Sequence, residues 1–377
     1  MSIGNFDGVH RGHVAIVRRL LERARRDVDD GLLPSAQIAL ARDGELIAFE
    51  TYGEATHESR YVVYSATKAF VAAAVWALIG DGLVDVGRPV AAYVPEFASN
   101  GKDGVTVEQV MLHTSGFPTA PLRPIDGDTS AGRTEAFARW RLNWEPGSTW
   151  EYHPTSAHWV LAEIVERVTG ADFRDVVQQR VTDPAGVPRV LGDVPHRAAP
   201  LQLVGEPASR DELMAVFGVP QLDVGEVTDE LLLSFDEPAL QRVGVPGAGG
   251  VMRAADLALF YQAVLRNPGE MWRPDVHADV TGRVRNTLPE RLTGLPANRT
   301  LGLIQAGDDG QSHLRGMGRT VSPLTVGHNG AKGQIAWGDP ATGLSLGYCT
   351  NGLDRNEVRT PRRTTAISSL AAVCVVP

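Results

Sequence analysis

The chain has 377 residues, 43% hydrophobic and 21% charged, with a formal net charge of −9 at pH 7. This composition is typical of a globular protein of one large or two smaller domains, and the acidic balance excludes a basic face for nucleic acid. Two cysteines, Cys349 and Cys374, give neither a disulfide framework nor a zinc-type spacing. The longest apolar run, Ala69 to Ile79, is too short to span a membrane. Because the N-terminus lacks a hydrophobic signal core, we expect a cytoplasmic protein.

The first stretch, Ile3 to His13, reads IGNFDGVHRGH and leads into a charged amphipathic helix predicted from His13 to Asp30. Its pattern resembles the nucleotide-binding start of the bacterial FAD synthetase nucleotidyltransferases, in which two histidines, here His10 and His13, approach a nucleotide phosphate. The resemblance covers barely a dozen residues, and the further βα units that such a domain needs do not follow. Binding of ATP or FMN therefore stays an alternative to a plain N-terminal arm.

The residues from Ser35 to Gly53 are predicted to form a β-hairpin. Two short β runs, QIAL and ELIAFE, lie on either side of the turn signal Asp43-Gly44. This hairpin directly precedes the stretch that carries the chemistry.

Ser65 and Lys68 lie three residues apart, at the predicted first turn of an apolar helix that runs to Gly80. Residues at i and i+3 share a helix face, so the hydroxyl and the amine can meet. A serine needs a base to take its proton, and the helix start and partial burial both favour the neutral amine that can act as one. Unpaired N–H groups at the same helix start can bind an oxyanion. The structural alternative is that Ser65 caps the helix and Lys68 reaches water.

The middle of the chain alternates short helices with loops. Periodicity and capping signals predict helices at 106–112, 135–142, 156–169, 172–181 and 210–217. Thr119 to Arg133 and Asp183 to Val245 are rich in proline and acidic residues. We expect them to be surface loops that wall a pocket and set its specificity.

The last part of the chain is predicted to return to a sheet. Gly247 to Gly250 opens a helix at 254–265, and the stretch from Asn267 to Asp308 is mostly irregular. Gly333 to Trp337 and Leu344 to Thr350 form a second hairpin candidate, and a closing helix follows at 364–373. Strands near both ends with helices between them indicate an α/β sheet interrupted by a helical insertion.

Five separated stretches fit one pattern, in order and in spacing. They are Ser65-Ala66-Thr67-Lys68, His113-Thr114-Ser115-Gly116, Glu145-Pro146-Gly147 leading to Tyr152, Gly247 to Val251, and Gly327-His328-Asn329-Gly330. From about Gly31 to Val373 the chain thus resembles the serine β-lactamase-like hydrolases, above all the carboxylesterases related to class C β-lactamases.

The resemblance implies a β-lactamase/transpeptidase-like α/β (α+β) fold, in which helices flank an antiparallel sheet. Residues 1–30 would be an N-terminal arm and helix, and residues 31–377 a single catalytic domain. A mainly helical and loop subdomain would be inserted at about 86–245.

Carried over by position, the resemblance makes Ser65 the acylated nucleophile and Lys68 the base that activates it. Tyr152 matches the tyrosine of the family's Y-x-N element and would share proton transfer, including protonation of the leaving group. For this tyrosine the structural alternative is a packed aromatic side chain whose hydroxyl is hydrogen-bonded.

The same resemblance places substrate-binding and oxyanion groups on the far side of the site. His328, Asn329 and Gly330 occupy the K-T-G position beside the pocket, where His328 is either a substrate contact or a structural residue. The backbone N–H groups of Ser65 and Ala331 would form the oxyanion hole. His113 to Gly116 is predicted to end a helix with its own hydrogen bonds and not to supply a catalytic histidine.

Two departures from the pattern affect the substrate. Pro154 stands where the asparagine of Y-x-N is expected, and His328, mostly neutral at pH 7, replaces the K-T-G lysine. Lys332 is close in sequence. The loss of an amide and of a fixed charge that would grip a β-lactam carboxylate favours small uncharged esters over penicillins and cephalosporins.

The main hypothesis is therefore a serine carboxylesterase that acts through an acyl-enzyme on a small-molecule ester. Acyl transfer to an alcohol or amine uses the same intermediate and stays open, as does weak β-lactamase or D-amino-acid peptidase activity. A catalytically silent binding protein on the same fold is the non-enzymatic alternative. We expect no metal, no organic cofactor, and no nucleic-acid or membrane partner, and the sequence leaves the oligomeric state open.

Overall fold

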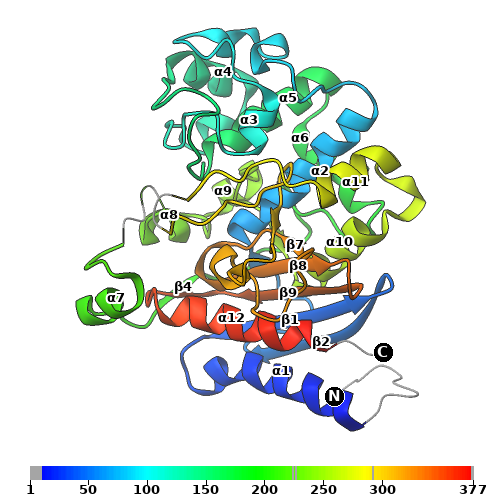
Figure 1. Cartoon of the computed structure of the whole chain (residues 1–377), viewed down its shortest axis with the longest axis vertical. Helices are drawn as coiled ribbons and strands as arrows, with labels where there is room; N and C mark the ends of the chain where they lie inside the picture. Colours follow the sequence, from blue (N-terminus) through cyan, green and yellow to red (C-terminus); the bar gives the residue numbers. More distant parts are fainter. Residues whose placement is uncertain (1–10, 223–224, 226, 291–292, 375–377) are drawn as a thin grey trace.

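The computed structural model describes residues 11–222, 225, 227–290 and 293–374, with side chains from residue 15 onward (Figure 1). The predicted nucleotide-binding motif at the N-terminus lies almost wholly outside this range. His10 is outside the described residues, and so is the side chain of His13.

A six-stranded antiparallel sheet with the order β2-β1-β9-β8-β7-β6 forms the centre of the fold. Its strands are β1 (Ser35–Arg42), β2 (Glu45–Gly53), β6 (Ile304–Gln305), β7 (Val326–Gly327), β8 (Ile335–Asp339) and β9 (Leu344–Thr350). Both predicted hairpins are confirmed as β1–β2 and β8–β9. The two hairpins join through β1 and β9, where Ile38 pairs with Tyr348.

Two short strand pairs connect distant parts of the chain. β3 (Tyr61–Val62) pairs antiparallel with β5 (Val251–Met252), and β10 (Gly352–Asp354) pairs in parallel with β4 (Gln202–Val204). The first pair brings the glycine-rich stretch before β5 next to the residues before Ser65.

The helices that surround the sheet differ in places from those expected. Within the described residues they are α1 (Arg11–Asp29), α2 (Thr67–Gly80), α3 (Val107–Met111), α4 (Ser130–Arg139), α5 (Ser156–Thr169), α6 (Phe173–Val177), α7 (Arg210–Phe217), α8 (Asp229–Ser234), α9 (Pro238–Val243), α10 (Ala254–Arg266), α11 (Pro274–Gly282) and α12 (Arg359–Ala372). Sequence patterns missed α8, α9 and α11. They also placed α4 too late, because the Thr129 hydroxyl accepts a hydrogen bond from Gly132 N and so caps a helix within the expected loop.

Helices cover both faces of the sheet, with α1 and α12 on one side and α2 and α10 on the other (Figure 1). Alternate residues of β1 show this directly. Ile38 and Leu40 pack with α1 and α12, whereas Ala39 and Ala41 join the larger core around α2. Burial on both faces explains why β1 and β9 are buried along almost their whole length.

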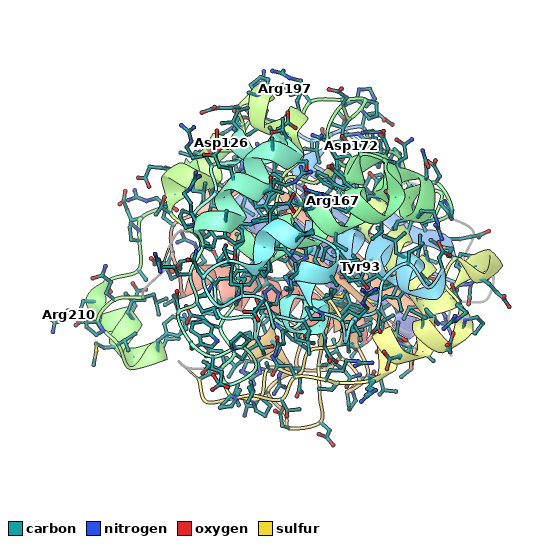
Figure 2. All side chains as sticks on the ribbon, turned by 90° about the horizontal axis from the view of Figure 1, so that it is seen from above. Tyr93, Asp126, Arg167, Asp172, Arg197 and Arg210 are labelled. Atoms are coloured by element: carbon teal, nitrogen blue, oxygen red, sulfur yellow. The ribbon has the colours of Figure 1, made fainter. Side chains whose placement is uncertain are left out.

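The helix α2 runs from the sheet into the helical part formed by α3 to α6 (Figure 1). Its side chains from Thr67 to Leu78 are all buried, which is typical of a helix that is apolar on every side. Seen from above, α7, with Arg210 at its start, lies apart at one side of the molecule (Figure 2). Among the described residues no helix is long and apolar enough to cross a membrane.

The N-terminal helix shares a core and an ion pair with the sheet side of the molecule. Arg363 on α12 is fully buried and pairs with Asp27 on α1 and with Asp354 at 2.6 Å. The division of the chain at residue 30, and the insertion of a subdomain at about 86–245, stay predictions.

Candidate active site

Ser65 lies in a short 3-10 helix, Tyr64–Ala66, that runs directly into α2. Tyr64 has a left-handed backbone with φ of 45°, which is unfavourable for a residue other than glycine. Its phenol donates a hydrogen bond to Leu232 O of α8 at 3.2 Å, and its carbonyl accepts one from the Thr67 hydroxyl. These contacts hold the turn that presents Ser65, which is half-buried.

Lys68 is fully buried one helical turn after Ser65. Its Nζ lies 3.2 Å from Ser65 Oγ and 2.6 Å from each of two backbone carbonyls, those of Pro154 and Gly247. A neutral amine has two N–H donors and one lone pair. The three oxygens can accept all three N–H groups of the charged lysine. When the amine has lost a proton, the two carbonyls can hold its remaining N–H groups and its lone pair can face the serine hydroxyl, as a general base requires.

Both carbonyls reach Lys68 because the backbone approaches closely. A Cβ at Gly247 would lie 3.3 Å from Lys68 Nζ and 3.2 Å from Pro154 O, so a side chain there would crowd the amine. The Thr67 hydroxyl accepts a hydrogen bond from Gly250 N at 2.9 Å and so ties the glycine-rich stretch to the start of α2.

Tyr152 is the third group brought to this point. The centroid of its ring lies 5.1 Å from Lys68 Nζ, and its hydroxyl is buried without a hydrogen-bond partner in the described part of the chain. The His113 ring packs 4.9 Å from the Tyr152 ring, and His113 Nδ1 accepts a hydrogen bond from His153 N at 3.2 Å. Ser115 Oγ lies 3.1 Å from His153 Nε2, so two residues of the H-T-S-G motif contact the segment that carries Tyr152.

The neighbouring histidines are neutral at physiological pH. Burial lowers the pKa of His113 well below its ordinary value and the pKa of His153 to about 4. An uncharged His153 can accept from Phe117 N through Nε2 while its Nδ1 donates to Glu151 O.

Ala331 lies beside the Ser65 turn, on a short helix, Ala331–Gly333, that connects β7 and β8. The backbone before it passes very close to the residues before Ser65, since a Cβ at Gly330 would lie 2.0 Å from Val63 O. This close approach brings the two predicted oxyanion segments together.

The three predicted substrate-binding residues differ in what their side chains do. The His328 ring is buried 6.0 Å from the Tyr152 ring, and its Nε2 has no hydrogen-bond partner among the described residues. Burial, then Arg299 and Lys68, lower the pKa of His328 well below its ordinary value. The Asn329 amide instead donates to Gly316 O and accepts from Ala336 N, so Asn329 and Gly330 can offer only backbone to a substrate.

Sequence patterns missed two features that bear on the charge of the site. Lys332 forms an ion pair at 2.8 Å with Asp229, the first residue of α8. Arg299 is buried with its Cζ 5.3 Å from the Tyr152 ring, and no motif or periodicity in its stretch pointed to it. Among the described residues no group of three His, Cys, Asp or Glu side chains could hold a metal ion.

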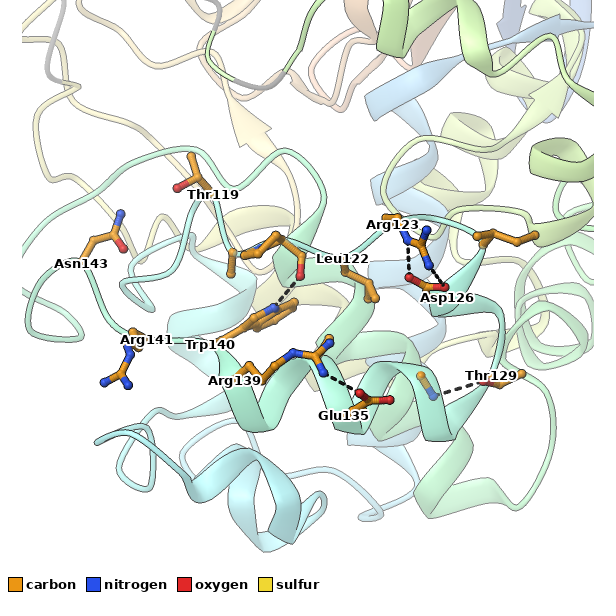
Figure 3. A pocket seen from close by; sticks show the side chains of 15 residues that line it. Thr119, Leu122, Arg123, Asp126, Thr129, Glu135, Arg139, Trp140, Arg141 and Asn143 are labelled. Carbon is orange, nitrogen blue, oxygen red and sulfur yellow. Dashed lines mark hydrogen bonds and ion pairs between the residues drawn. The ribbon is translucent and has the colours of Figure 1, made fainter.

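A pocket of about 830 Å³ lies between the loop 119–129 and α4 (Figure 3). Trp140 and Leu122 are among the side chains that line it, and two ion pairs, Arg123–Asp126 and Arg139–Glu135, cross its wall. None of the 15 residues that line it belongs to the serine, lysine and tyrosine group. The expectation that this loop walls the active site stays a prediction.

Comparison with known proteins places the chain among β-lactamase-like sequences. The family model described as Beta-lactamase matches residues 17–371, and the model described as FAD synthetase matches residues 1–30. The "Esterase/beta-lactamase LipL" of Mycobacterium tuberculosis is 29% identical, with 78% of this chain and 70% of that protein covered.

Solved structures show the same β-lactamase/transpeptidase-like fold. A penicillin-binding protein homolog from Caulobacter crescentus superposes with a TM-score of 0.75 at 23% identity, covering 99% of this chain and 100% of that one. A family VIII carboxylesterase superposes with a TM-score of 0.74 at 24% identity, covering 96% and 98%.

Proposed function

Since the chain belongs to the beta-lactamase family of serine hydrolases, we propose that it cleaves small uncharged carboxylic esters through an acyl-enzyme on Ser65. The observation that carries this proposal is the placement of Lys68. Its amine lies 3.2 Å from the Ser65 hydroxyl and is buried between two carbonyl groups. A lysine that only reached for solvent would not be buried in this way.

In the first half of the reaction Lys68 takes the proton of Ser65 Oγ, which attacks the ester carbonyl carbon. The N–H groups of Ser65 and Ala331 stabilise the tetrahedral oxyanion. Its collapse breaks the bond to the leaving oxygen, which receives a proton from Tyr152, and Tyr152 is reprotonated from Lys68. The alcohol departs and the acyl group stays on Ser65.

In the second half a water molecule attacks the carbonyl carbon of the acyl-enzyme in place of Ser65. The same groups take a proton from the water, and Ser65 Oγ leaves with a proton returned to it. The products are one carboxylic acid and free enzyme. Acyl transfer differs only in that an alcohol or amine replaces water.

Three observations support an ester over a β-lactam. Pro154 offers Lys68 a carbonyl but has no side-chain amide for a substrate. His328 is neutral, because burial lowers its pKa well below its ordinary value. Lys332 is paired with Asp229 and so does not supply the missing charge.

The test measures kcat/KM for p-nitrophenyl butyrate, a chromogenic cephalosporin and a D-alanyl-D-alanine peptide. We expect the ester to be preferred by about 100-fold or more, and Ser65→Ala to lower ester turnover by about 10⁴-fold or more. Ser148→Ala, at an exposed serine, is the matched control and should leave turnover unchanged. Equal rates on the cephalosporin would refute the ester preference, and full activity of Ser65→Ala would refute the mechanism.

A further inference from the structure

Arg299 is a buried cation without a counter-charge among the residues that the structure describes. The residue is only 5% exposed, and its Nε and Nη1 atoms have no hydrogen-bond partner in the described part of the chain. Other buried arginines are paired, Arg133 with Glu163 at 2.8 Å and Arg363 with Asp354 at 2.6 Å. An unpaired buried charge is costly, so its retention at this place calls for a functional reason.

The guanidinium lies against two aromatic rings, with its Cζ 5.3 Å from the Tyr152 ring centroid and 5.4 Å from that of Trp150. Lys68 Nζ lies 5.1 Å from the same Tyr152 ring. The Tyr152 ring is therefore close to the Arg299 guanidinium and to the Lys68 amine. Cations over aromatic faces are attracted by the ring, more strongly where water is excluded.

The backbone fixes Arg299 at this position. Its N–H donates to Asn286 O at 3.1 Å, and the Asn286 amide in turn donates to Leu112 O at the end of α3. Two residues later, Leu301 O accepts the indole N–H of Trp76 on α2 at 2.7 Å. The stretch that carries the cation is thus tied to α3, which ends just before His113, and to α2, which begins beside the site.

The charge on Arg299 persists at neutral pH although burial lowers its pKa to about 10. The histidines that its field reaches are uncharged. His113, His158 and His328 each have a pKa well below the ordinary value, first because of burial and then in part because of Arg299. No ion pair of the described residues includes Arg299, so its field at Tyr152 is not cancelled by a bound carboxylate.

We propose that Arg299 is a positioning residue for the tyrosine, whose fixed charge stabilises the negative charge that the Tyr152 oxygen carries while it passes its proton to the leaving group. This proposal rests on the proposed function. A cation fixed in a dry site acts on developing charge more strongly than one in water and needs no reorganisation during the reaction. Arg299 thereby supplies a positive charge near Tyr152, which neutral His328 and the paired Lys332 do not.

A direct grip on a substrate carboxylate is the competing use of the same charge. The burial of Nε and Nη1 and the rings of Trp150 and Tyr152 beside the guanidinium argue against it, because a bidentate grip on a carboxylate needs at least one of these two buried atoms. The two uses predict losses of kcat/KM on different esters when the charge is removed.

The test compares kcat/KM for ethyl butyrate and p-nitrophenyl butyrate in Arg299→Met. These esters share an acyl group, but ethoxide needs a proton to leave and p-nitrophenolate does not. Because proton donation contributes about 10²- to 10⁴-fold, we expect a loss of about 100-fold on the ethyl ester and about 5-fold or less on the nitrophenyl ester. Arg299→Lys should restore most of the difference.

Arg60→Met is the matched control, because Arg60 is 3% exposed and its Nε and Nη1 also lack a hydrogen-bond partner in the described part of the chain, but its Nη1 forms an ion pair with Asp256 at 3.6 Å. Arg60→Met should change kcat/KM for the ethyl ester and for the nitrophenyl ester by the same factor. If Arg299→Met does not fold, Arg299→Gln removes the charge in its place, and Arg299→Lys serves as the charged reference. Tyr152→Phe should remove the effect, so that adding Arg299→Met to it costs no further selectivity.

Three results would overturn the proposal. Equal losses on both esters would reduce Arg299 to a structural residue. Retained selectivity of Arg299→Met, with no loss on the ethyl ester, would show that the charge is not used. A loss confined to monoethyl succinate, an ester that carries a carboxylate, would identify a ligand grip instead. Failure of the wild-type chain to hydrolyse p-nitrophenyl butyrate would refute the proposed function itself and is thus distinguishable from all three.

Discussion

Replacing Gly330 with alanine should damage the oxyanion hole more than the fold. A Cβ at Gly330 would lie 2.0 Å from Val63 O, whereas real Cβ contacts essentially never fall below 3.0 Å. The two backbone segments must therefore separate by about 1 Å, the difference between those distances. One segment leads to Ala331 and the other to Ser65, so the two proposed N–H donors move apart.

The size of the effect follows from that displacement. A shift of about 1 Å in a catalytic group costs about 10²-fold, and loss of one oxyanion donor costs about 10²- to 10³-fold. We expect kcat/KM of Gly330→Ala for p-nitrophenyl butyrate to fall about 100-fold, or about 2.7 kcal/mol in transition-state stabilisation. Overpacking should lower the free energy of unfolding by about 1–3 kcal/mol.

The assay pairs steady-state kinetics with urea unfolding to separate the two effects. Gly104→Ala is the matched control, since Gly104 is exposed and an added Cβ there meets nothing within 4 Å. It should leave both quantities unchanged. A folded Gly330→Ala protein with wild-type kcat/KM would refute the placement of the oxyanion hole between these segments.

Tyr152→Phe should keep the free energy of unfolding, because the hydroxyl has no partner among the described residues, yet lower kcat/KM for ethyl butyrate about 100-fold; a large loss of stability would contradict this. Lys68→Met should lower kcat by about 10³-fold or more and destabilise the fold by a few kcal/mol, since the Pro154 and Gly247 carbonyls lose their donor; an active variant would rule out the lysine base. Burial lowers the pKa of His153 to about 4, against about 6.5 when unfolded, so the unfolded chain binds the proton first. The contribution of neutral His153 to the free energy of unfolding is therefore complete above about pH 6.5 and falls by about 3 kcal/mol as the pH drops to about 4. Urea unfolding of the wild type and of His153→Gln should show this difference, and an equal pH dependence of the two proteins would refute it.

Local patterns were sufficient for the parts of the site that are close in sequence. The i, i+3 spacing predicted that Ser65 and Lys68 would meet, and the apolar run after them predicted the buried helix α2. The alternation on either side of two turns predicted both hairpins of the sheet. The family resemblance supplied the fold, and it supplied Tyr152, which no local pattern distinguishes from a packed aromatic residue.

Sequence patterns could not predict the side-chain contacts that depend on the tertiary fold. Arg299 lies in a stretch without periodicity and reaches Tyr152 only because its backbone is bound beside α3. The Asn329 amide is turned toward Gly316, and Lys332 has a left-handed backbone and pairs with Asp229. Which way such side chains turn is decided by partners far away in the sequence.

The most direct measurement is the site of covalent labelling by a fluorophosphonate, read by mass spectrometry. Trypsin cleaves after Arg60 and Lys68, and the resulting peptide, Tyr61 to Lys68, contains one serine. We expect a single adduct on that peptide in the wild-type chain and none in Ser65→Ala. A label on another peptide, or one that persists in Ser65→Ala, would contradict Ser65 as the nucleophile.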